Sequence, residues 1–283
     1  MKLSVIVSTY NQPEWLEKVL HGYQHQTFQD FEIVIADDGS DQRTAELIEL
    51  FRKSANFPIK HVWHPDAGFQ KCAILNKAIA QSDADYLVFT DGDCIPRQDF
   101  LATHARLAEP GKFLSGGYCK LDLALSREIT TQDIASGRAF SLAWLRDHGL
   151  KDFSQSIKIG AKPAMALMLD QFSLTKATWN GHGSSTWKQN ILAVNGHNEQ
   201  MKYGGEDREM GERLMNRSLS GKRIRYRAVL LHLDHTRSYV NPEDLARNLE
   251  FRKQTVASRT TWCDQGIIKG PRQDHSTSAP HHG

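Results

Sequence analysis

The nine residues Asp85-Tyr86-Leu87-Val88-Phe89-Thr90-Asp91-Gly92-Asp93 run from an apolar segment directly into two carboxylates. The segment Asp85–Phe89 predicts a buried β-strand. Alternate residues of an extended chain point to the same side, and Gly92 lets the backbone turn close to a ligand. We therefore expect Asp91 and Asp93 to offer oxygen ligands to Mg²⁺ or Mn²⁺ bridging a diphosphate. The alternative is a turn with two solvated carboxylates, and the apolar strand before it favours the metal site.

Two earlier apolar segments also end on polar residues. A strand over Leu3–Ser8 ends at Thr9-Tyr10-Asn11, and a strand over Phe31–Ala36 ends at Asp37-Asp38. Helical patterns separate the strands, which predicts an α/β fold with a mostly parallel central sheet flanked by helices. Ligands of such sheets bind beyond the carboxyl ends of the strands. We expect these polar ends to meet there, where an aromatic ring and a carboxylate hold a nucleobase and further oxygens hold ribose and metal.

An acidic pair and two histidines are the candidate functional residues of the second half. Glu206 and Asp207 open a predicted helix after two glycines, where the helix dipole favours an ionised Asp207 that can accept a proton. His232 and His235 follow a strand expected over Arg223–Leu233, and an imidazole there would complete the Mn²⁺ coordination begun at Asp93. An ordinary acidic helix start and a surface histidine pair are the alternative interpretations.

The remaining segments predict one domain over 1–267, with halves 1–120 and 121–267, and a disordered tail over 268–283. Residues 121–178 mix short helical patches and are expected to face the acceptor. The glycine-rich stretch 179–187 is either a flexible segment beside a sugar or a structural turn. A final helix is expected from Asn241-Pro242 to about Trp262. The basic residues of 222–227 face either an anionic, membrane-borne acceptor or solvent.

The composition excludes several classes of protein. A net charge of +2 over 283 residues predicts no nucleic-acid partner. The four cysteines occur singly, which indicates a reducing compartment. The apolar run at the start is too short for a signal peptide, and none reaches the length of a membrane span. We expect a cytoplasmic protein whose membrane contact, on the cytoplasmic face, is at most peripheral.

Several motifs, in this order, resemble those of the family 2 glycosyltransferases, which have the Rossmann-like GT-A fold. The first three are Ser4–Asn11, Ile35–Ser40 and Thr90–Asp93. The segment from Gly181 to Asp207 is similar to the galactosyltransferase-type C-terminal region of a subset of that family. The resemblance covers most of residues 1–240.

The resemblance implies a role for each matching residue. Thr9, Tyr10 and Asn11 would contact the nucleotide and Asp38 the uracil, while Asp91 and Gly92 would lie near ribose and metal. Asp93 would be a direct metal ligand, and His232 or His235 would be the late metal histidine. Asp207 would be the catalytic base, with Glu206 binding acceptor or donor sugar. The full set of site residues is Thr9, Tyr10, Asn11, Asp38, Asp91, Gly92, Asp93, Glu206, Asp207, His232 and His235.

The implied activity is that of a metal-dependent inverting glycosyltransferase of the hexosyl- or N-acetylhexosaminyltransferase class. It would move a sugar from a UDP-sugar to a hydroxyl of a glycan or lipid-linked glycan, in bacterial lipopolysaccharide or capsule synthesis. Gly183 stands where many relatives have asparagine, so the donor sugar is not implied. The processive Q-x-x-R-W signature is missing, which favours single addition. The rival functions are a nucleotidyltransferase, a catalytically silent sugar-binding module and a retaining mechanism.

Overall fold

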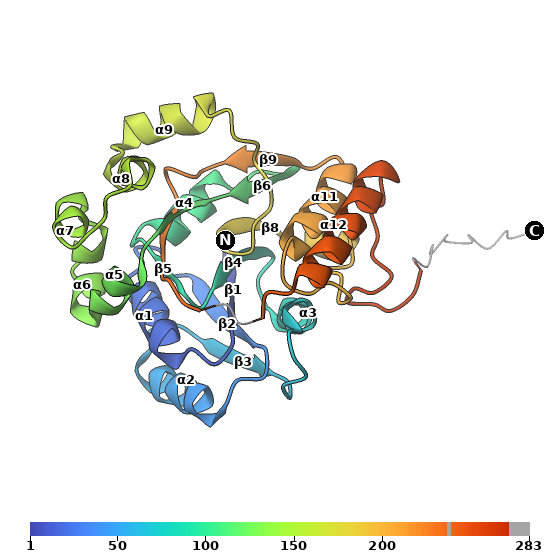
Figure 1. Cartoon of the computed structure of the whole chain (residues 1–283), viewed down its shortest axis with the longest axis horizontal. Coiled ribbons are helices and arrows are strands. Elements are labelled where there is room, and N and C mark those ends of the chain that lie inside the picture. The colour runs from blue at the N-terminus through green and yellow to red at the C-terminus, as the bar shows by residue number, and fades with distance from the viewer. Residues whose placement is uncertain (237–238, 272–283) are drawn as a thin grey trace, which may run out of the picture.

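A seven-stranded sheet forms the centre of the computed structural model, which describes residues 1–236 and 239–271 (Figure 1). Its strands are arranged in the order β3-β2-β1-β4-β8-β6-β9, and the first four are parallel. Strand β8 is antiparallel to both of its neighbours, whereas β6 and β9 are parallel. The prediction of a mostly parallel α/β sheet is therefore confirmed. The strands are β1 Leu3–Thr9, β2 Phe31–Asp37, β3 Ile59–Trp63, β4 Tyr86–Asp91, β6 Lys112–Ser115, β8 Ser184–Trp187 and β9 Ser220–Arg223.

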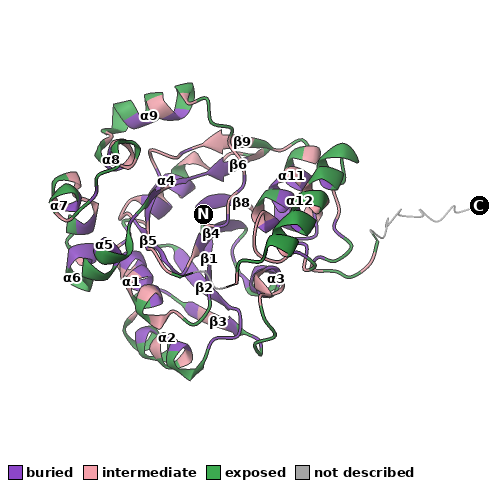
Figure 2. Ribbon diagram, viewed as in Figure 1, coloured by how far each residue is buried: buried purple, intermediate pink, exposed green. Residues whose placement is uncertain are grey.

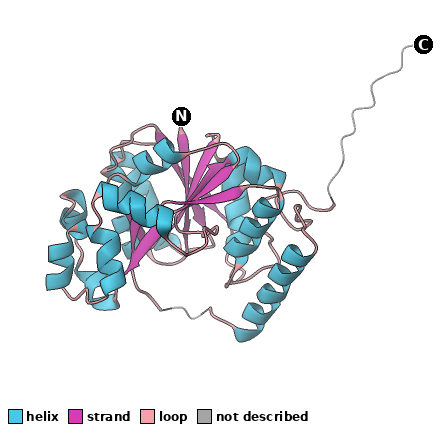
Figure 3. Cartoon of the chain, turned by 90° about the horizontal axis from the view of Figure 1, so that it is seen from above, coloured by secondary structure: helices cyan, strands magenta, loops and turns pink. Residues whose placement is uncertain are grey.

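Helices cover both faces of this sheet (Figure 3). Because side chains alternate along a strand, Val5 and Val7 of β1 pack with α1 and α2, whereas Ile6 packs with α3 and α11. Figure 2 shows the sheet as the most deeply buried part of the chain. The helices that complete this layer structure are α1 Pro13–Gln24, α2 Gln42–Ser54, α3 Lys71–Gln81, α4 Phe100–Leu107, α10 Lys188–Ala193, α11 Glu206–Asn216 and α12 Pro242–Ala257.

A second, three-stranded sheet consists of β5 (Cys94–Pro96), β10 (Val229–His232) and β7 (Gly117–Lys120), with β10 in the middle. The turn Asp91-Gly92-Asp93 joins β4 of the large sheet to β5 of the small one. The predicted strand Arg223–Leu233 is wrong, because a turn divides it into β9 and β10. The amide of Ala228 donates to the Ile224 carbonyl at 2.7 Å within that turn. The two strands belong to different sheets, so the chain has to change direction between them.

Residues 121–178 form a run of short helices rather than a continuous pattern. Four of them begin at a side chain that accepts a hydrogen bond from a backbone amide of the first turn, at Asp122, Thr130, Ser141 and Asp152. The run ends with α9, which packs at the outer edge of the molecule (Figure 1). The helices are α5 Leu123–Glu128, α6 Thr131–Ala135, a 3₁₀ turn at Arg138–Phe140, α7 Leu142–Asp147, α8 Phe153–Gly160 and α9 Pro163–Phe172.

The C-terminal helix begins as predicted, with the Asn241 side chain accepting from the Glu243 amide. It ends at Ala257, before the predicted Trp262. Residues 268–271 of the expected disordered tail are described, and the Ile268 amide donates to Asn195 Oδ1 at 2.8 Å. The remainder of that tail, 272–283, lies outside the described residues. Within the described ranges, no helix is both long and apolar enough to span a bilayer.

Candidate active site

A cavity of about 1000 Å³ opens at the carboxyl ends of β1, β2 and β4. All of the site residues singled out in the sequence line this cavity. They reach it from three strand ends of the large sheet, from the start of α11, and from the end of β10 and the segment after it, which are far apart in the sequence. The residues are Thr9, Tyr10, Asn11, Asp38, Asp91, Gly92, Asp93, Glu206, Asp207, His232 and His235.

Asp91 accepts hydrogen bonds from two groups at the end of β4. Ser8 Oγ lies 2.6 Å and Lys71 Nζ 2.8 Å from Asp91 Oδ1. His182 Nδ1 lies 4.0 Å from the other carboxylate oxygen. Burial acts to raise the pKa of Asp91, but the positive charges of Lys71 and His182 and the hydrogen bonds from Lys71 and Ser8 together outweigh it and hold this pKa well below its ordinary value. Asp91 is therefore ionised and held in place by the protein's own groups.

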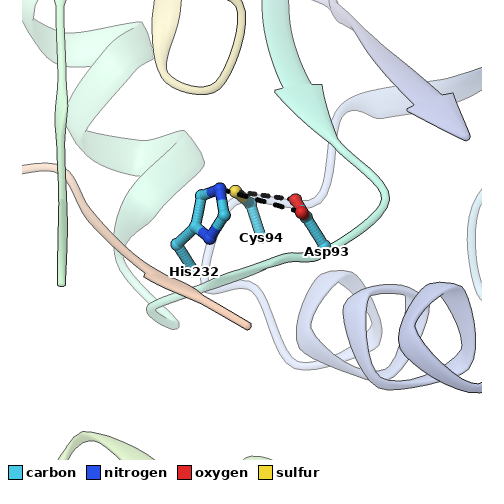
Figure 4. Close-up of side chains that lie close together, drawn as sticks. All are labelled: Asp93, Cys94 and His232. Carbon is cyan, nitrogen blue, oxygen red and sulfur yellow. Dashed lines mark hydrogen bonds and ion pairs between the residues drawn. The ribbon is translucent and has the colours of Figure 1, made fainter. Parts of the chain in front are cut away.

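Asp93 lies among two histidines and a cysteine. His235 Nε2 is 3.0 Å and His232 Nε2 3.7 Å from Asp93 Oδ2. The pairing of Cys94 with His232 across β5 and β10 fixes this geometry. Potential ligand atoms of Asp93, Cys94 and His232 all lie within 4.8 Å of one another (Figure 4). Asp91, which was also predicted as a metal ligand, is not part of this group.

The ligand chemistry of the group fits a divalent cation bound by oxygen and nitrogen. Burial acts to raise the pKa of Asp93, but the hydrogen bond to His235 and the charge of His232 bring it below its ordinary value. Burial and the charge of Asp93 raise the pKa of the Cys94 thiol well above its usual range. Cys94 therefore stays protonated and donates to Asp93 Oδ1 at 3.3 Å. The carboxylate and the imidazoles suit Mn²⁺ better than a neutral thiol does.

Glu206 and Asp207 occupy the first turn of α11, as predicted. Gly205 precedes them with φ +90°, a backbone conformation that favours glycine. Burial, together with the charge of Asp207, raises the pKa of Glu206 to about 7. Burial also raises the pKa of Asp207, although Lys71 offsets part of the effect. The helix dipole was expected to favour an ionised Asp207, whereas burial shifts its pKa in the opposite direction.

Asp207 packs closely against the glycine-rich segment before β8. A Cβ placed on Gly181 would lie 2.4 Å from Asp207 Oδ2, so a larger residue would displace the carboxylate. Asp207 Oδ1 is buried and accepts no hydrogen bond from the described residues. A buried carboxylate oxygen without a donor is costly, and a bound hydroxyl would satisfy it. The segment 179–187 was expected to be flexible or a turn. It is partly a central strand, β8.

Asp38 is oriented by a histidine that sequence analysis missed. Lys77 Nζ lies 3.1 Å from His64 Nδ1, and because an ammonium group can only donate, Nδ1 is the acceptor. The ring proton of this neutral tautomer is on Nε2, which donates to Asp38 Oδ1 at 2.8 Å. The Gln70 amide donates to the other oxygen at 2.9 Å. Asp38 therefore has a fixed orientation at the cavity wall.

Tyr10 and Asn11 form the part of the cavity wall that follows β1. The Tyr10 hydroxyl donates to Asp66 Oδ2 at 2.9 Å, while its ring is 43% exposed. Asn11 has φ +48°, and its side-chain oxygen accepts from the Asp41 amide at 2.8 Å. This side-chain bond supports a backbone conformation that few residues other than glycine adopt. An exposed aromatic face beside a carboxylate is suited to stacking with a flat base.

Other cavity residues carried no sequence signal that we recognised. Lys71 was not singled out in the sequence, and its position beside three carboxylates depends on the tertiary fold. Burial acts to lower the pKa of Lys71, but the charges of Asp91, Asp207 and Glu206 hold it well above its usual range. His182 packs edge-on against Tyr118. Three aromatic rings on separate segments also gather at the cavity wall, those of Phe69, Tyr203 and Tyr239.

Two family descriptions match the chain. Residues 4–117 match glycosyl transferase family 2. This match includes β1 to β4 and the turn Asp91–Asp93. Residues 165–236 match the N-terminal domain of galactosyltransferase. The second match contains Glu206, Asp207, His232 and His235, so the two matches together include every predicted site residue.

Two curated relatives align with three quarters of the chain. The chondroitin synthase of Pasteurella multocida is 26% identical over an alignment of 235 residues that covers 75% of this chain and 23% of that protein. The validoxylamine A glucosyltransferase of Streptomyces hygroscopicus subsp. jinggangensis is 28% identical over an alignment of 227 residues that covers 75% of this chain and 51% of that protein. The chain thus spans about half or less of the length of these relatives.

Solved structures share the fold. Staphylococcus aureus TarS 1–349 in complex with UDP superimposes with a TM-score of 0.61 at 16% identity, covering 92% of this chain and 68% of that one. The mannosyltransferase PcManGT of Pyrobaculum calidifontis, in complex with GDP-Man and Mn²⁺, gives 0.56 at 15% identity and covers 91% and 73%. The strand order and these neighbours agree on the GT-A fold, and the family matches place a glycosyl transferase family 2 domain over residues 4–117 and a galactosyltransferase-type region over residues 165–236.

Proposed function

We propose that this protein is a metal-dependent, inverting glycosyltransferase that moves a sugar from a UDP-sugar to an acceptor hydroxyl. One observation carries the proposal. The histidine-carboxylate group around Asp93 and the half-buried carboxylate Asp207 line the same cavity, so one cavity can hold both a leaving diphosphate and an acceptor hydroxyl. We place the reaction in the synthesis of a bacterial surface glycan, lipopolysaccharide or capsule, with a glycan or lipid-linked glycan as acceptor.

Asp93, His232 and His235 would hold Mn²⁺ or Mg²⁺. The Nε2 atoms of His232 and His235 lie near Asp93 Oδ2. The neutral Cys94 thiol donates a hydrogen bond to the other carboxylate oxygen, Oδ1. When bound, such an ion neutralises the negative charge that develops on a departing nucleoside diphosphate. Asp91, fixed by Ser8 and Lys71, lies beside the group and would face the ribose.

Asp207 would act as the general base of a single displacement. The acceptor hydroxyl donates its hydrogen bond to Asp207 and gives up its proton there as its oxygen attacks the anomeric carbon. The bond from that carbon to the diphosphate oxygen breaks, and the nucleoside diphosphate leaves with the bonding electrons. Attack opposite the leaving group inverts the configuration. The raised pKa of Asp207 suits a base because proton affinity near the working pH favours transfer.

A uracil base is favoured by the fixed carboxylate of Asp38. His64 and Gln70 hold both of its oxygens, which leaves further lone pairs directed at the cavity for the N–H group of a pyrimidine. The structural neighbour TarS is in complex with UDP, in agreement with a uridine nucleotide, whereas the neighbour PcManGT is in complex with GDP-Man.

The test is release of nucleoside diphosphate from a panel of UDP-, GDP- and dTDP-sugars, with Mn²⁺ or with EDTA. We expect release from a UDP-sugar that requires the metal and is lost in Asp93→Ala. Release that continues in EDTA would contradict the metal dependence. Donor binding without turnover, across a panel of acceptor glycans, would instead indicate a silent sugar-binding module. Analysis of the anomeric configuration of the product distinguishes inversion from retention.

A further inference from the structure

An exposed apolar surface lies on α9 and the loop that follows it. Met165, Met168 and Phe172 are spaced three and four residues apart and therefore lie on one face of the helix. Phe172 is 77% exposed and Leu174, in the loop, is 100% exposed. Figure 2 shows α9 as mostly exposed at the edge of the molecule. We call these four residues, with Lys162 and Lys176, the α9 surface.

The apolar side chains of the α9 surface are not what holds the helix in place. Only Ala166 and Asp170 of α9 are buried. Arg227 Nε donates to Asp170 Oδ2 at 2.7 Å, and Arg223 Nε donates to the Asp170 carbonyl at 2.9 Å. These polar contacts fix α9 against the turn between β9 and β10. Arg223 and Arg227, two of the basic residues considered for acceptor binding, are therefore used to hold α9 in place.

The charge of the α9 surface is positive. Lys162 and Lys176 are exposed at its two ends. The single acidic residue between them, Asp170, is buried and paired with Arg227. Lysines beside exposed apolar side chains are the combination that binds the interface of an anionic lipid bilayer. A purely protein-binding apolar surface has no need of lysines at both ends with no exposed acid between them.

The α9 surface is continuous with the cavity. Leu174 is fully exposed, and the next two residues, Thr175 and Lys176, line the cavity wall. The Thr175 carbonyl accepts a hydrogen bond from Arg223 at 3.1 Å. The same arginine therefore holds both α9 and the loop that leads from it to the cavity. A flat surface that contacts α9 therefore reaches the edge of the site.

We propose that the α9 surface docks on an anionic lipid bilayer, with Phe172 and Leu174 inserted at the interface and the two lysines against lipid phosphates. The inference concerns binding and does not depend on the proposed transfer reaction. If that reaction holds, docking presents the cavity to an acceptor carried by lipid.

The experiment measures co-sedimentation of the full chain with vesicles of phosphatidylcholine alone or mixed with phosphatidylglycerol. We expect binding only to the mixed vesicles, weakened by salt. Phe172→Ser/Leu174→Ser should weaken it by more than about tenfold, and Lys162→Glu by roughly fivefold or more. The matched control is Leu249→Ser/Val256→Ser on α12, whose side chains are 49% and 55% exposed and lie apart from α9.

Several results would overturn the proposal. These are an absence of binding to mixed vesicles, binding that the α9 variants leave intact, or equal weakening by the α12 control. Light scattering that shows a dimer abolished by Phe172→Ser/Leu174→Ser would assign the surface to a second copy of the chain. Thermal unfolding of each variant establishes that the fold is retained. Vesicle binding is read without substrate, so its failure is separate from any failure of the proposed activity.

Discussion

Lys71 Nζ lies 2.8 Å from Asp91 Oδ1, which places a half-buried cation within a group of carboxylates. The pKa of Lys71 is held well above its usual range by Asp91, Asp207 and Glu206 together. The effect is reciprocal, because Lys71 lowers the proton affinity of all three. Lys71 therefore links the metal side of the cavity to the proposed base.

Removing this cation is expected to shift the pH dependence of the activity. In Lys71→Met the pKa of Asp207 rises, so the acidic limb of the rate profile moves to higher pH by roughly one unit. The matched variant Lys71→Arg retains the charge and should keep the limb near its wild-type position. A pH-rate series on both variants measures this, and equal profiles for Lys71→Met and wild type would contradict it. Circular dichroism checks that each variant remains folded.

Asp207→Asn should lower turnover by roughly 10²–10⁴-fold, the usual contribution of a positioned general base. Donor affinity should be nearly unchanged, because the amide preserves the shape of the side chain against Gly181. Single-turnover rates and calorimetric titration with the nucleotide separate the two quantities. A variant with wild-type turnover would rule out Asp207 as the base.

His64→Ala should weaken uridine nucleotide binding by roughly tenfold, because Asp38 loses the donor that fixes its orientation. The natural control is His61→Ala. His61 Nε2 lies 2.8 Å from Asp37 Oδ2, a histidine-aspartate contact of the same kind at the residue before Asp38. Neither His61 nor Asp37 lines the cavity. Calorimetry with UDP compares them. Similar losses in both variants would show that the effect comes from general destabilisation of the strand ends.

His232→Ala and His235→Ala should each weaken Mn²⁺ binding, by roughly 10–100-fold if both are ligands. Cys94→Ser should have little effect, since its thiol is protonated and donates a hydrogen bond to the proposed ligand Asp93. Electron paramagnetic resonance of free Mn²⁺ measures the affinities. If one histidine variant binds the ion like wild type, that histidine is not a ligand.

The raised pKa of Glu206 predicts a pH-dependent stability. Its pKa rises from an ordinary 4.5 to about 7 on folding, so the folded state binds more protons between these values. The free energy of unfolding should therefore fall as pH rises through this window, with a slope of at most about 1.4 kcal/mol per pH unit from this group. Glu206→Gln should flatten the slope. Denaturant titrations at several pH values test this, and an unchanged slope in Glu206→Gln would assign it to other groups.

Much of the fold of residues 1–120 could be predicted from the sequence because its signals are local. Apolar runs mark β1, β2 and β4, and polar residues at their ends mark the edge of the sheet. The short helices α5 to α8 were not resolved individually, although Asp122, Thr130, Ser141 and Asp152 are recognisable N-cap residues.

What the sequence could not indicate depends on tertiary packing. Nothing local to Lys71 or His64 indicates which carboxylate each will meet. The proximity of His232 to Asp93 follows from the register of β5 with β10, two strands about 135 residues apart in the chain. The turn that separates β9 from β10 was missed because its basic and apolar residues continue the alternation of a strand.

The run of helices α5 to α9 connects β7 to β8 along the chain. None of the proposed metal ligands and neither proposed acidic residue of α11 lies on it. Insertions and deletions within it would leave the register of β4 with β8, and of β5 with β10, unaltered. Leu125, Ile134 and Leu145 of this run share the core of β1 and α1. We therefore expect a chimeric enzyme to tolerate changes of length in the connections between these helices while the chemistry at the sheet edge is retained.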